Sequence, residues 1–406
     1  MLPVEEAQQS ILGNTKVLDP VEIPLTEAGG LVLAEDIISP VNLPYFTNSA
    51  MGGYAVKSKD TMGAKENSPV TLKVMGVIRA GDYPDFTIRD NVAAKIMTGA
   101  PLPNGADAVV MVEYTEEETG IVKVKRSVNQ GENVRYEGEE IKKGEIALEK
   151  GTELNPASIG FIAGLGIRKI RVYRRPRVAF FVTGEEVVGI DEELRPGKIR
   201  DTNSITLSMA LSQENVEFLF LGRARDELSD IEEKLKKGLK VCDLLIVTGG
   251  VSVGDYDYVK KALENIAVEA IIWRVAQRPG GPMFFGKKGE ILIFGLPGNP
   301  TSSLVCFYEY VRPALLKMLA KEKVFLLEME AALLEDITKK PDGKTHFLRG
   351  YLEKQGNAFY VKSTGSQGSH ILKSFAISNC FIIVPSNITH LSSGSRVRVH
   401  LLPKWA

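Results

Sequence analysis

The chain contains Leu292-Ile293-Phe294-Gly295-Leu296-Pro297-Gly298-Asn299-Pro300-Thr301-Ser302-Ser303, a stretch that predicts a buried strand, a tight turn and a helix. Asn299 suits the N-cap position, and Pro300 suits the first helical position, where the missing N–H of proline costs nothing. Free backbone N–H groups and the positive end of the helix dipole would then face a ligand beyond the strand. Taken alone, the stretch fits either an anion-binding turn or an ordinary connection.

The sequence on both sides of this stretch alternates between apolar strands and helices. We predict strands at 177–182, 217–221, 244–247, 269–275 and 291–294, and helices at 204–214, 231–239, 258–266 and 300–319. Continuously apolar strands that alternate with helices indicate a parallel sheet covered on both faces. Residues 176–320 are therefore predicted to form a three-layer α/β domain.

The remaining sequence predicts three further domains. Residues 45–141 contain short β runs between Gly, Pro and Asn turns, which indicates an inserted β-rich domain. Residues 1–44 and 142–175 carry helix and strand patterns on either side of it, and we assign them together to a discontinuous N-terminal α+β domain. Period-2 segments return at 321–406 and predict a C-terminal β barrel or sandwich.

The composition excludes several classes of function. The 406 residues carry a formal net charge of −1, so there is no basic surface to attract nucleic acid or an anionic membrane. No segment is apolar for long enough to span a bilayer, and no secretory signal opens the chain, so we expect a cytoplasmic protein. Three widely separated cysteines support neither a disulfide framework nor a thiolate zinc site, and the four histidines lack metal-ligand spacing.

Polar loops follow five consecutive strands of the predicted sheet. They span residues 183–186, 222–226, 248–257, 276–282 and 296–303 and are rich in glycine, hydroxyl and charged groups. Ligands of open α/β sheets bind beyond the carboxyl ends of the strands. Arg274 or Arg278 could neutralise a bound oxyanion, whereas Glu186, Asp226 and Asp257 would repel it unless Mg²⁺ stood between them. We therefore predict a nucleotide-like ligand with Mg²⁺.

Two familiar nucleotide motifs do not fit. Gly343-Lys344-Thr345 resembles the end of a Walker A loop, but Thr338 stands where the first glycine belongs, and we predict a hairpin turn. The glycines at 249, 250 and 254 lack the G-x-G-x-x-G order of a dinucleotide fold, which disfavours a dehydrogenase.

Many short motifs occur in one order along nearly the whole chain. They are Asn48-Ser49-Ala50-Met51-x-Gly53-Tyr54-Ala55-Val56, Ile96-Met97-Thr98-Gly99-Ala100-Pro101, Gly105-Ala106-Asp107-Ala108-Val109-Val110, Thr183-Gly184-x-Glu186, Asp201-Thr202-Asn203, Gly249-Gly250-Val251-Ser252, Pro279-Gly280-x-Pro282, Leu296 to Pro300, and Gln367-Gly368-Ser369-His370. With these motifs the chain resembles the molybdopterin molybdenumtransferases, or molybdenum insertases, the family that includes the C-terminal domain of gephyrin.

The resemblance implies an enzyme that takes adenylylated molybdopterin and molybdate, cleaves the phosphoanhydride, and releases AMP with molybdenum cofactor. It also implies four domains, an elongated homodimer, and a third domain that binds the pterin nucleotide. Contact with the molybdopterin adenylyltransferase that makes the substrate is compatible with it. Tungstate remains an alternative to molybdate, because the two oxyanions share their charge and nearly their shape.

The resemblance also implies roles for single residues of this chain that match functional positions of the family. The resemblance makes Glu186 and Asp257 the Mg²⁺ ligands, and it makes Asp226, Arg274, Arg278 and Thr98 catalytic residues, with arginine where many members carry lysine at 274 and 278. The substrate-binding residues that it implies are Thr183, Gly184, Asp201, Asn203, Gly249, Gly250, Ser252, Pro279, Gly280, Pro297, Gly298, Asn299, Pro300, Ser302, Arg135, Arg349 and Ser369, some of them contributed by the partner chain.

One departure from the family pattern bears on activity. Gly52 stands where the family usually has aspartate, so a carboxylate expected near the cleft is missing, and Glu140 replaces a common aspartate more mildly. The alternative to an active enzyme is therefore a weakly active or non-catalytic paralogue that binds the pterin, serves as a scaffold or handles tungstate. A different nucleotide hydrolase on a related domain would not explain the N- and C-terminal matches.

Overall fold

The computed structural model describes residues 1–250 and 258–403. The chain divides into two compact units, one of Met1–Glu22, Gly30–Ala34 and Arg171–Ala406, the other of Ile23–Gly29 and Glu35–Ile170. β1 (Pro20–Pro24) and β12 (Lys169–Tyr173) lie where the chain passes from one unit to the other. Among the described residues, every helix is too short or too polar to cross a membrane.

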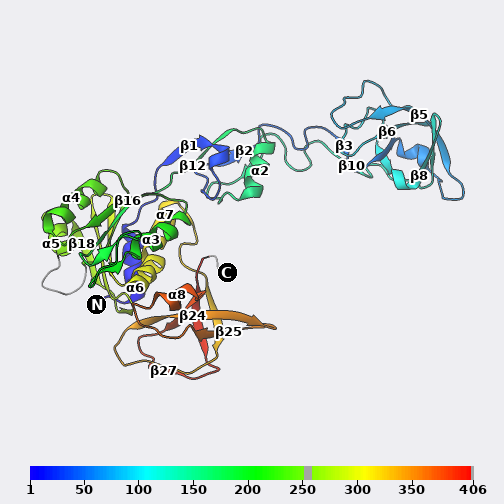
Figure 1. The fold of residues 1–406 in the computed structure, drawn as a ribbon. Coiled ribbons are helices and arrows are strands. Elements are labelled where there is room, and N and C mark those ends of the chain that lie inside the picture. The colour runs from blue at the N-terminus through cyan, green and yellow to red at the C-terminus, as the bar shows by residue number, and fades with distance from the viewer. Residues whose placement is uncertain (251–257, 404–406) are drawn as a thin grey trace. The chain divides into compact units, whose positions relative to one another are not determined.

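A six-stranded mixed sheet forms the centre of the first unit (Figure 1). Its strands lie in the order β16 (Glu217–Ala224), β13 (Arg177–Thr183), β17 (Leu244–Thr248), β21 (Ile291–Leu296), β20 (Pro282–Lys288) and β18 (Glu269–Arg274). The first four are mutually parallel, and β20 pairs antiparallel with both β21 and β18. The five predicted strands therefore run in one direction, and the strand that the sequence analysis missed, β20, runs the other way.

Helices cover both faces of this sheet. On β13, Val178 and Phe180 contribute to the core on one face, and Ala179 and Phe181 to the core on the other. The first core receives residues of α1 (Val4–Asn14), α3 (Asn203–Ser212) and the helical segment 300–318. The second core receives residues of α4 (Leu228–Leu239) and α5 (Tyr258–Asn265). The predicted three-layer α/β fold is confirmed.

Helix α1 packs with the α/β part of the chain. Its Val4, Ala7 and Ile11 are buried in the first core, whereas the sequence-based division assigns residues 1–44 to an N-terminal domain. An amphipathic helix is stable where its apolar face is covered, and α7 (Arg312–Met318) lies against α1. The predicted domain boundaries stay a prediction.

The predicted long helix at 300–319 is interrupted by a wider turn. It consists of α6 (Pro300–Cys306), a π turn (Phe307–Val311) and α7. Pro313 has no N–H to donate to the carbonyl of Glu309, four residues earlier. That carbonyl instead accepts a hydrogen bond from Gln8 Nε2 at 3.3 Å, so a side chain of α1 takes the place of the missing backbone bond.

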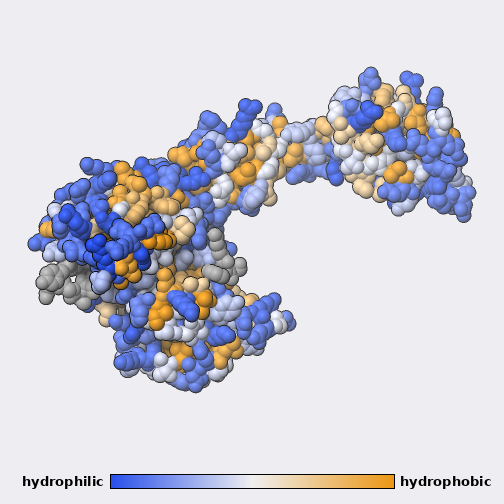
Figure 2. All heavy atoms as spheres, viewed as in Figure 1, coloured by the Kyte–Doolittle hydropathy of each residue, from blue (hydrophilic) through white to orange (hydrophobic). Residues whose placement is uncertain are grey.

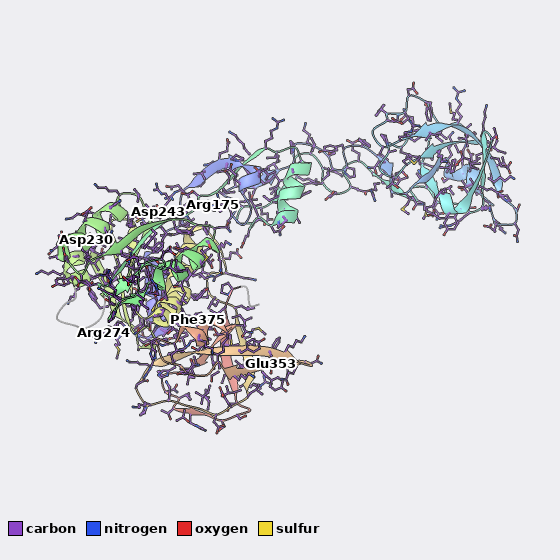
Figure 3. The ribbon with its side chains drawn as sticks, viewed as in Figure 1. Arg175, Asp230, Asp243, Arg274, Glu353 and Phe375 are labelled. Atoms are coloured by element: carbon purple, nitrogen blue, oxygen red, sulfur yellow. The ribbon has the colours of Figure 1, made fainter. Side chains whose placement is uncertain are left out.

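A closed β barrel completes the first unit. It is built from β22 (Glu328–Leu333), β24 (Thr345–Gln355), β25 (Ala358–Ser363), β26 (Cys380–Val384) and β28 (Arg396–Leu401), and β24 pairs with both β25 and β26. α8 (Leu372–Ala376) carries Phe375 into the core that the barrel shares with the α/β part, and Figure 3 labels this residue. The predicted C-terminal β domain is confirmed, and of the two predicted forms it takes the barrel.

The second unit is rich in β structure, as predicted. Its six-stranded sheet has the order β7 (Ala108–Met111), β4 (Gly53–Val56), β6 (Val92–Ile96), β5 (Val70–Ile78), β9 (Ile121–Val124) and β8 (Thr115–Glu118). Two short antiparallel pairs accompany it, β2 (Ile37–Ile38) with β11 (Ile146–Leu148) and β3 (Asn48–Ser49) with β10 (Val134–Arg135). Helix α2 (Pro156–Gly164) begins where the Asn155 side chain accepts a hydrogen bond from Ser158 N–H.

Candidate active site

A cleft of about 1240 Å³ lies in the first unit, beyond the carboxyl ends of the codirectional strands. The loops after β13, β16, β17 and β21 line it, together with residues 277–282 between β18 and β20. The barrel contributes Lys344, Gln367, Ser369, His370 and Leu372. The strand-end loops that the sequence analysis selected are thus brought together, and the barrel adds a wall that they do not provide.

Most of the predicted site residues line this cleft. They are Thr183, Gly184, Glu186, Asp201, Asn203, Asp226, Gly249, Gly250, Arg278, Pro279, Gly280, Pro297, Gly298, Asn299, Pro300, Ser302 and Ser369. Asn299 is the N-cap residue of α6 with Pro300 following, as predicted, although its side chain makes no capping hydrogen bond.

The other predicted site residues lie elsewhere. Arg274 ends β18 and does not line the cleft, and Figure 3 labels it on the α/β part. Arg349 is fully buried within the barrel. Thr98 and Arg135 belong to the second unit. Ser252 and Asp257 lie outside the described residues.

The middle of the cleft is built from backbone. Gly249 follows β17 with a φ of 88°, and its N–H donates to Leu296 O of β21 at 3.0 Å. A Cβ at Gly249 would lie 2.6 Å from Thr183 Oγ1 and 2.7 Å from Thr183 O, so only glycine fits there. The carboxyl ends of β13, β17 and β21 therefore pack directly on one another at Gly249. Because glycine has no side chain, the backbone at this point is accessible to a ligand.

Charged groups are distributed unevenly across the cleft. Glu186 and Asp226 follow β13 and β16 at one edge of the sheet, while Arg278 lies between β18 and β20 at the other. Asp226 Oδ2 accepts a hydrogen bond from Glu185 N–H at 3.2 Å. Arg200 also lines the cleft, but its guanidinium donates to backbone carbonyls of its own loop. The cleft therefore joins an acidic end to a basic end.

Asn203 offers an unused acceptor in this cleft. Its Nδ2 donates to Gly298 O at 2.8 Å, which fixes the orientation of the side chain. Its Oδ1 is buried and has no hydrogen-bond partner within residues 1–250 and 258–403. An unpaired buried carbonyl oxygen is costly, so a donor on a bound ligand is the natural partner for it.

A buried network supports the loop at 277–282. Gln277 Nε2 donates to Pro279 O at 3.0 Å, Tyr310 OH donates to Gln277 Oε1, and Cys306 Sγ donates to Gly280 O at 3.4 Å. Burial raises the pKa of both the Cys306 thiol and the Tyr310 phenol, so both keep their protons. Cys306 therefore contributes to the core and to this hydrogen-bond network as a protonated thiol. All three cysteines are buried and unpaired.

Arg349 supports the barrel side of the cleft. Its guanidinium donates to the carbonyls of Ser366, Gln367 and Gly368 and to Ser374 Oγ, at 3.1 to 3.2 Å. Burial lowers the pKa of Arg349 to about 10. The loop that carries Ser369 is thereby fixed from behind, and Thr301 Oγ1 holds it from the α/β side by donating to Ser369 O.

Several residues that line the cleft lie outside the loops and motifs that the sequence marks. They are Tyr258, Lys344 and Leu372. Gln277 lies in the predicted loop at 276–282, but no motif marks it individually as a site residue. Lys344 belongs to the string Gly343-Lys344-Thr345, for which the sequence predicts a hairpin turn. Thr345 is instead the first residue of β24, and the preceding strand β23 (Ile337–Thr338) pairs with β27 (His390–Leu391), so the string does not close a hairpin.

A second cluster of predicted residues lies within the other unit. Ser49 exchanges backbone hydrogen bonds with Gly99 and Ala100, and Arg135 pairs with Asn48 across β3 and β10. A Cβ built on Gly52 would lie 3.8 Å from Thr98 Oγ1. Thr98, Arg135 and the position of the missing carboxylate therefore belong to one exposed surface of this unit.

Comparison with known proteins places the chain in a family. Models described as the MoeA N-terminal region (domain I and II), a probable molybdopterin binding domain and the MoeA C-terminal region (domain IV) match residues 2–166, 179–317 and 330–402. The molybdopterin molybdenumtransferase of Haemophilus influenzae is 37% identical over 99% of this chain and 100% of its own length. The chain belongs to the molybdopterin molybdenumtransferase family.

Further relatives agree with this assignment. Molybdopterin molybdenumtransferase 2 of Mycobacterium tuberculosis is 34% identical over 98% of this chain and 99% of its own. The crystal structure of the molybdopterin biosynthesis moeA protein from Pyrococcus horikoshii has a TM-score of 0.82 and 31% identity, and the match covers 99% of this chain and 100% of that one. The predicted family, and with it the prediction of an enzyme, is confirmed. The roles of single residues stay predictions.

Proposed function

We propose that this molybdopterin molybdenumtransferase inserts molybdate into adenylylated molybdopterin, with Mg²⁺-dependent cleavage of the phosphoanhydride and release of AMP and molybdenum cofactor. Its relatives carry the transferase name, and the family model over residues 179–317 is described as a probable molybdopterin binding domain. The observation that carries the proposal is the charge arrangement of the cleft, which has carboxylates at one end, cations at the other and glycine loops between them.

This arrangement suits a substrate that contains a phosphoanhydride. The glycine loops at 249–250 and 297–298 let phosphates approach backbone N–H groups, as anion-binding turns do. Arg278 can balance the charge that develops on the oxygens as the anhydride splits. Asn203 Oδ1 can accept a hydrogen bond from a donor on the substrate, because it has no partner among the residues that the structure describes.

The described residues fit Mg²⁺ by their donor chemistry. Glu186 and Asp226 both line the acidic end of the cleft, and carboxylate oxygens are the ligands that Mg²⁺ prefers. The third expected carboxylate, Asp257, lies outside the described residues, and within them no group of three ligands forms. Bound at this end, Mg²⁺ would neutralise anhydride oxygens.

No side chain needs to act as a nucleophile. An oxygen of water or of molybdate forms the new bond to the AMP phosphorus as the anhydride P–O bond breaks, and the bridging oxygen leaves on the pterin phosphate. Where molybdate supplies the oxygen, its Mo–O bond breaks as well, and a dithiolene sulfur of the pterin takes the vacated position on molybdenum. The Cys306 thiol lies close to the cleft loop, but it is buried and its raised pKa keeps it protonated, so it is a poor metal ligand.

We also propose a homodimer in the cytoplasm. Edge strand β16 exposes Phe218, Leu219 and Phe220, and α3 beside it exposes Ile205 and Met209. Figure 2 shows hydrophobic residues among hydrophilic ones on the α/β part of the chain. An exposed apolar patch next to an unpaired strand edge is typical of an interaction surface. Three unpaired thiols suit a reducing compartment.

The substrate also defines a further proposed partner. Adenylylated molybdopterin must come from an adenylyltransferase, so a transient contact with that enzyme would protect the ligand in transit.

The test is an AMP-release assay with purified protein, adenylylated molybdopterin, Mg²⁺ and molybdate. Glu186→Gln keeps the shape of the side chain and removes its charge, so we expect a loss of at least about a hundredfold in rate. Glu193→Gln serves as the control, because Glu193 is exposed between β14 (Val187–Val188) and β15 (Ile199–Arg200) and does not line the cleft. No AMP above a protein-free reaction would refute the proposed activity, and equal rates for the two variants would refute the role of Glu186.

A second candidate function has one observation in its favour. Gly52 leaves the surface beside Thr98 without the carboxylate usual for the family. The alternatives are a weakly active or non-catalytic paralogue that binds the pterin or acts as a scaffold, and an enzyme that handles tungstate. Each of them would bind the ligand tightly and release little AMP when molybdate is the oxyanion supplied. Repeating the assay with tungstate separates these cases.

A further inference from the structure

We propose that Lys344 of the barrel is a further substrate-contacting residue, which together with Arg278 holds a tetrahedral oxyanion at the basic end of the cleft. This inference rests on the proposed function, because it assigns a residue to the same site. Lys344 directly precedes β24 of the barrel, which also contributes Gln367, Ser369, His370 and Leu372 to the cleft, whereas Arg278 lies between β18 and β20 of the α/β part.

The turn that carries Lys344 is held rigidly. Lys344 N–H donates to Asp342 Oδ1 at 3.1 Å, and Lys344 O accepts from Lys339 Nζ at 2.5 Å. His346 Nε2 lies 3.0 Å from Asp342 Oδ2, so the same carboxylate is held from a second side. The backbone on both sides of Lys344 is thereby fixed, and the residue lines the cleft.

The turn is also joined to the segment that carries Arg278. β19 (Gln277–Arg278) pairs in parallel with β24, with Gln277 opposite Thr345 and Arg278 opposite His346. Thr345 N–H donates to Ala276 O at 3.0 Å. Lys344 directly precedes this pairing, so the two cationic residues lie on adjacent backbone segments at the same end of the cleft.

Neither cation is neutralised within the described part of the chain. Lys344 and Arg278 make no ion pair or side-chain hydrogen bond there. Asp342 is the nearest carboxylate along the chain, but it is engaged by His346 and by the Lys344 backbone. Two like charges side by side repel each other, and a bound anion converts this repulsion into attraction.

The geometry indicates the class of ligand. A guanidinium and an ammonium carried by two adjacent backbone segments suit a compact oxyanion with several acceptor oxygens better than a flat pterin ring. The reaction offers two such groups, free molybdate and a phosphate of the nucleotide. Both oxyanions are therefore tested.

The experiment compares Lys344→Met, Lys344→Arg and Lys340→Met. Methionine matches the length of lysine without its charge, and Lys340 is an exposed residue of the same turn region that does not line the cleft. Three quantities are measured for each variant. They are the KM for molybdate in AMP release, the Kd for molybdate by equilibrium dialysis, and the Kd for adenylylated molybdopterin without molybdate.

We expect Lys344→Met to weaken one of these affinities about tenfold, which corresponds to ~1.4 kcal/mol for a lost charge-assisted contact. Lys344→Arg should restore most of the affinity, and Lys340→Met should match the wild type. A change in the molybdate constants identifies molybdate as the oxyanion. A change in nucleotide affinity alone identifies a phosphate.

Two results would overturn the inference. The first is a Lys344→Met protein whose affinities all stay within about twofold of Lys340→Met. The second is an equal loss in Lys344→Met and Lys344→Arg, because a role of the charge requires rescue by arginine. If the wild type binds these ligands but releases no AMP, the proposed function fails, and the binding constants still decide the role of Lys344.

Discussion

Substituting Gly249 by alanine tests how closely the strand-end loops pack in the middle of the cleft. The added Cβ would lie 2.6 Å from Thr183 Oγ1 and 2.7 Å from Thr183 O, and the second of these atoms belongs to the backbone. An alanine with a φ of 88° costs ~1–2 kcal/mol. Relieving the contact with Thr183 should cost a further ~1–3 kcal/mol, as overpacking of a core does.

The matched control is Gly289→Ala in the turn between β20 and β21. Gly289 also has a positive φ, 60°, but a Cβ there would meet nothing within 4 Å. Its substitution therefore reports the backbone cost alone. We expect Gly249→Ala to lower the stability of the first unit by about 1–3 kcal/mol more than the control, a difference of ~2–4 °C in Tm per kcal/mol.

Thermal unfolding followed by circular dichroism measures this difference, and the Kd for adenylylated molybdopterin measures its effect on the cleft. Because Thr183 must move, ligand affinity should fall in Gly249→Ala and stay unchanged in Gly289→Ala. Equal Tm values for the two variants would show that Gly249 does not pack against Thr183. Normal ligand affinity in Gly249→Ala would refute the role of this loop in binding.

Two further predictions concern His400 and Gly52. Burial alone would lower the pKa of His400, but Glu309 at 2.9 Å from its Nδ1 and Glu328 at 3.4 Å from its Nε2 outweigh burial and raise the pKa above 6.5. Protonated His400 therefore stabilises the fold fully below pH 6.5, and this stabilisation is lost as the pH rises through the folded-state pKa. The free energy of unfolding, measured with urea, should fall more between pH 6 and 8 in the wild type than in His400→Gln. The same dependence on pH in both proteins would contradict this prediction. Gly52→Asp should fold normally, because within the described part of the chain Thr98 Oγ1 is the one atom beyond the adjacent residues that lies within 4 Å of the new Cβ. The new carboxylate should raise the rate of AMP release about tenfold by assisting the reaction. An unchanged rate would show that the reaction of this chain does not use a carboxylate at position 52.

The five codirectional strands of the central sheet can be predicted from the sequence, whereas the antiparallel strand β20 cannot. Apolar runs with helical spacers identify five strands of the central sheet, because burial on both faces leaves a clear pattern. β20 escapes this reasoning because it begins at Pro282, directly after a loop rich in glycine and proline. Proline is tolerated at the first residue of a strand, and local sequence cannot reveal that β20 returns antiparallel beside β21.

The residues of the candidate site likewise differ in how far the sequence predicts them. Strand-end loops can be predicted from sequence because all codirectional strands end at one edge of the sheet. Lys344 could not be predicted, because its place depends on how the barrel packs against the α/β part. Arg349 matches a family motif, yet it is buried behind the loop at 366–368. A motif reports that a residue matters, and packing decides whether it faces the ligand.

The π turn at Phe307–Val311 restricts which insertions and deletions this helix can tolerate. Glu309 accepts a hydrogen bond from His400 of the barrel, and the next residue, Tyr310, donates to Gln277 beneath the cleft loop. Each residue of an α-helix advances by about 100° around its axis, so removing one residue here would rotate everything after it by that amount. One of the two contacts would then be lost. The length of this segment is therefore as much a requirement of the protein as the identity of its side chains.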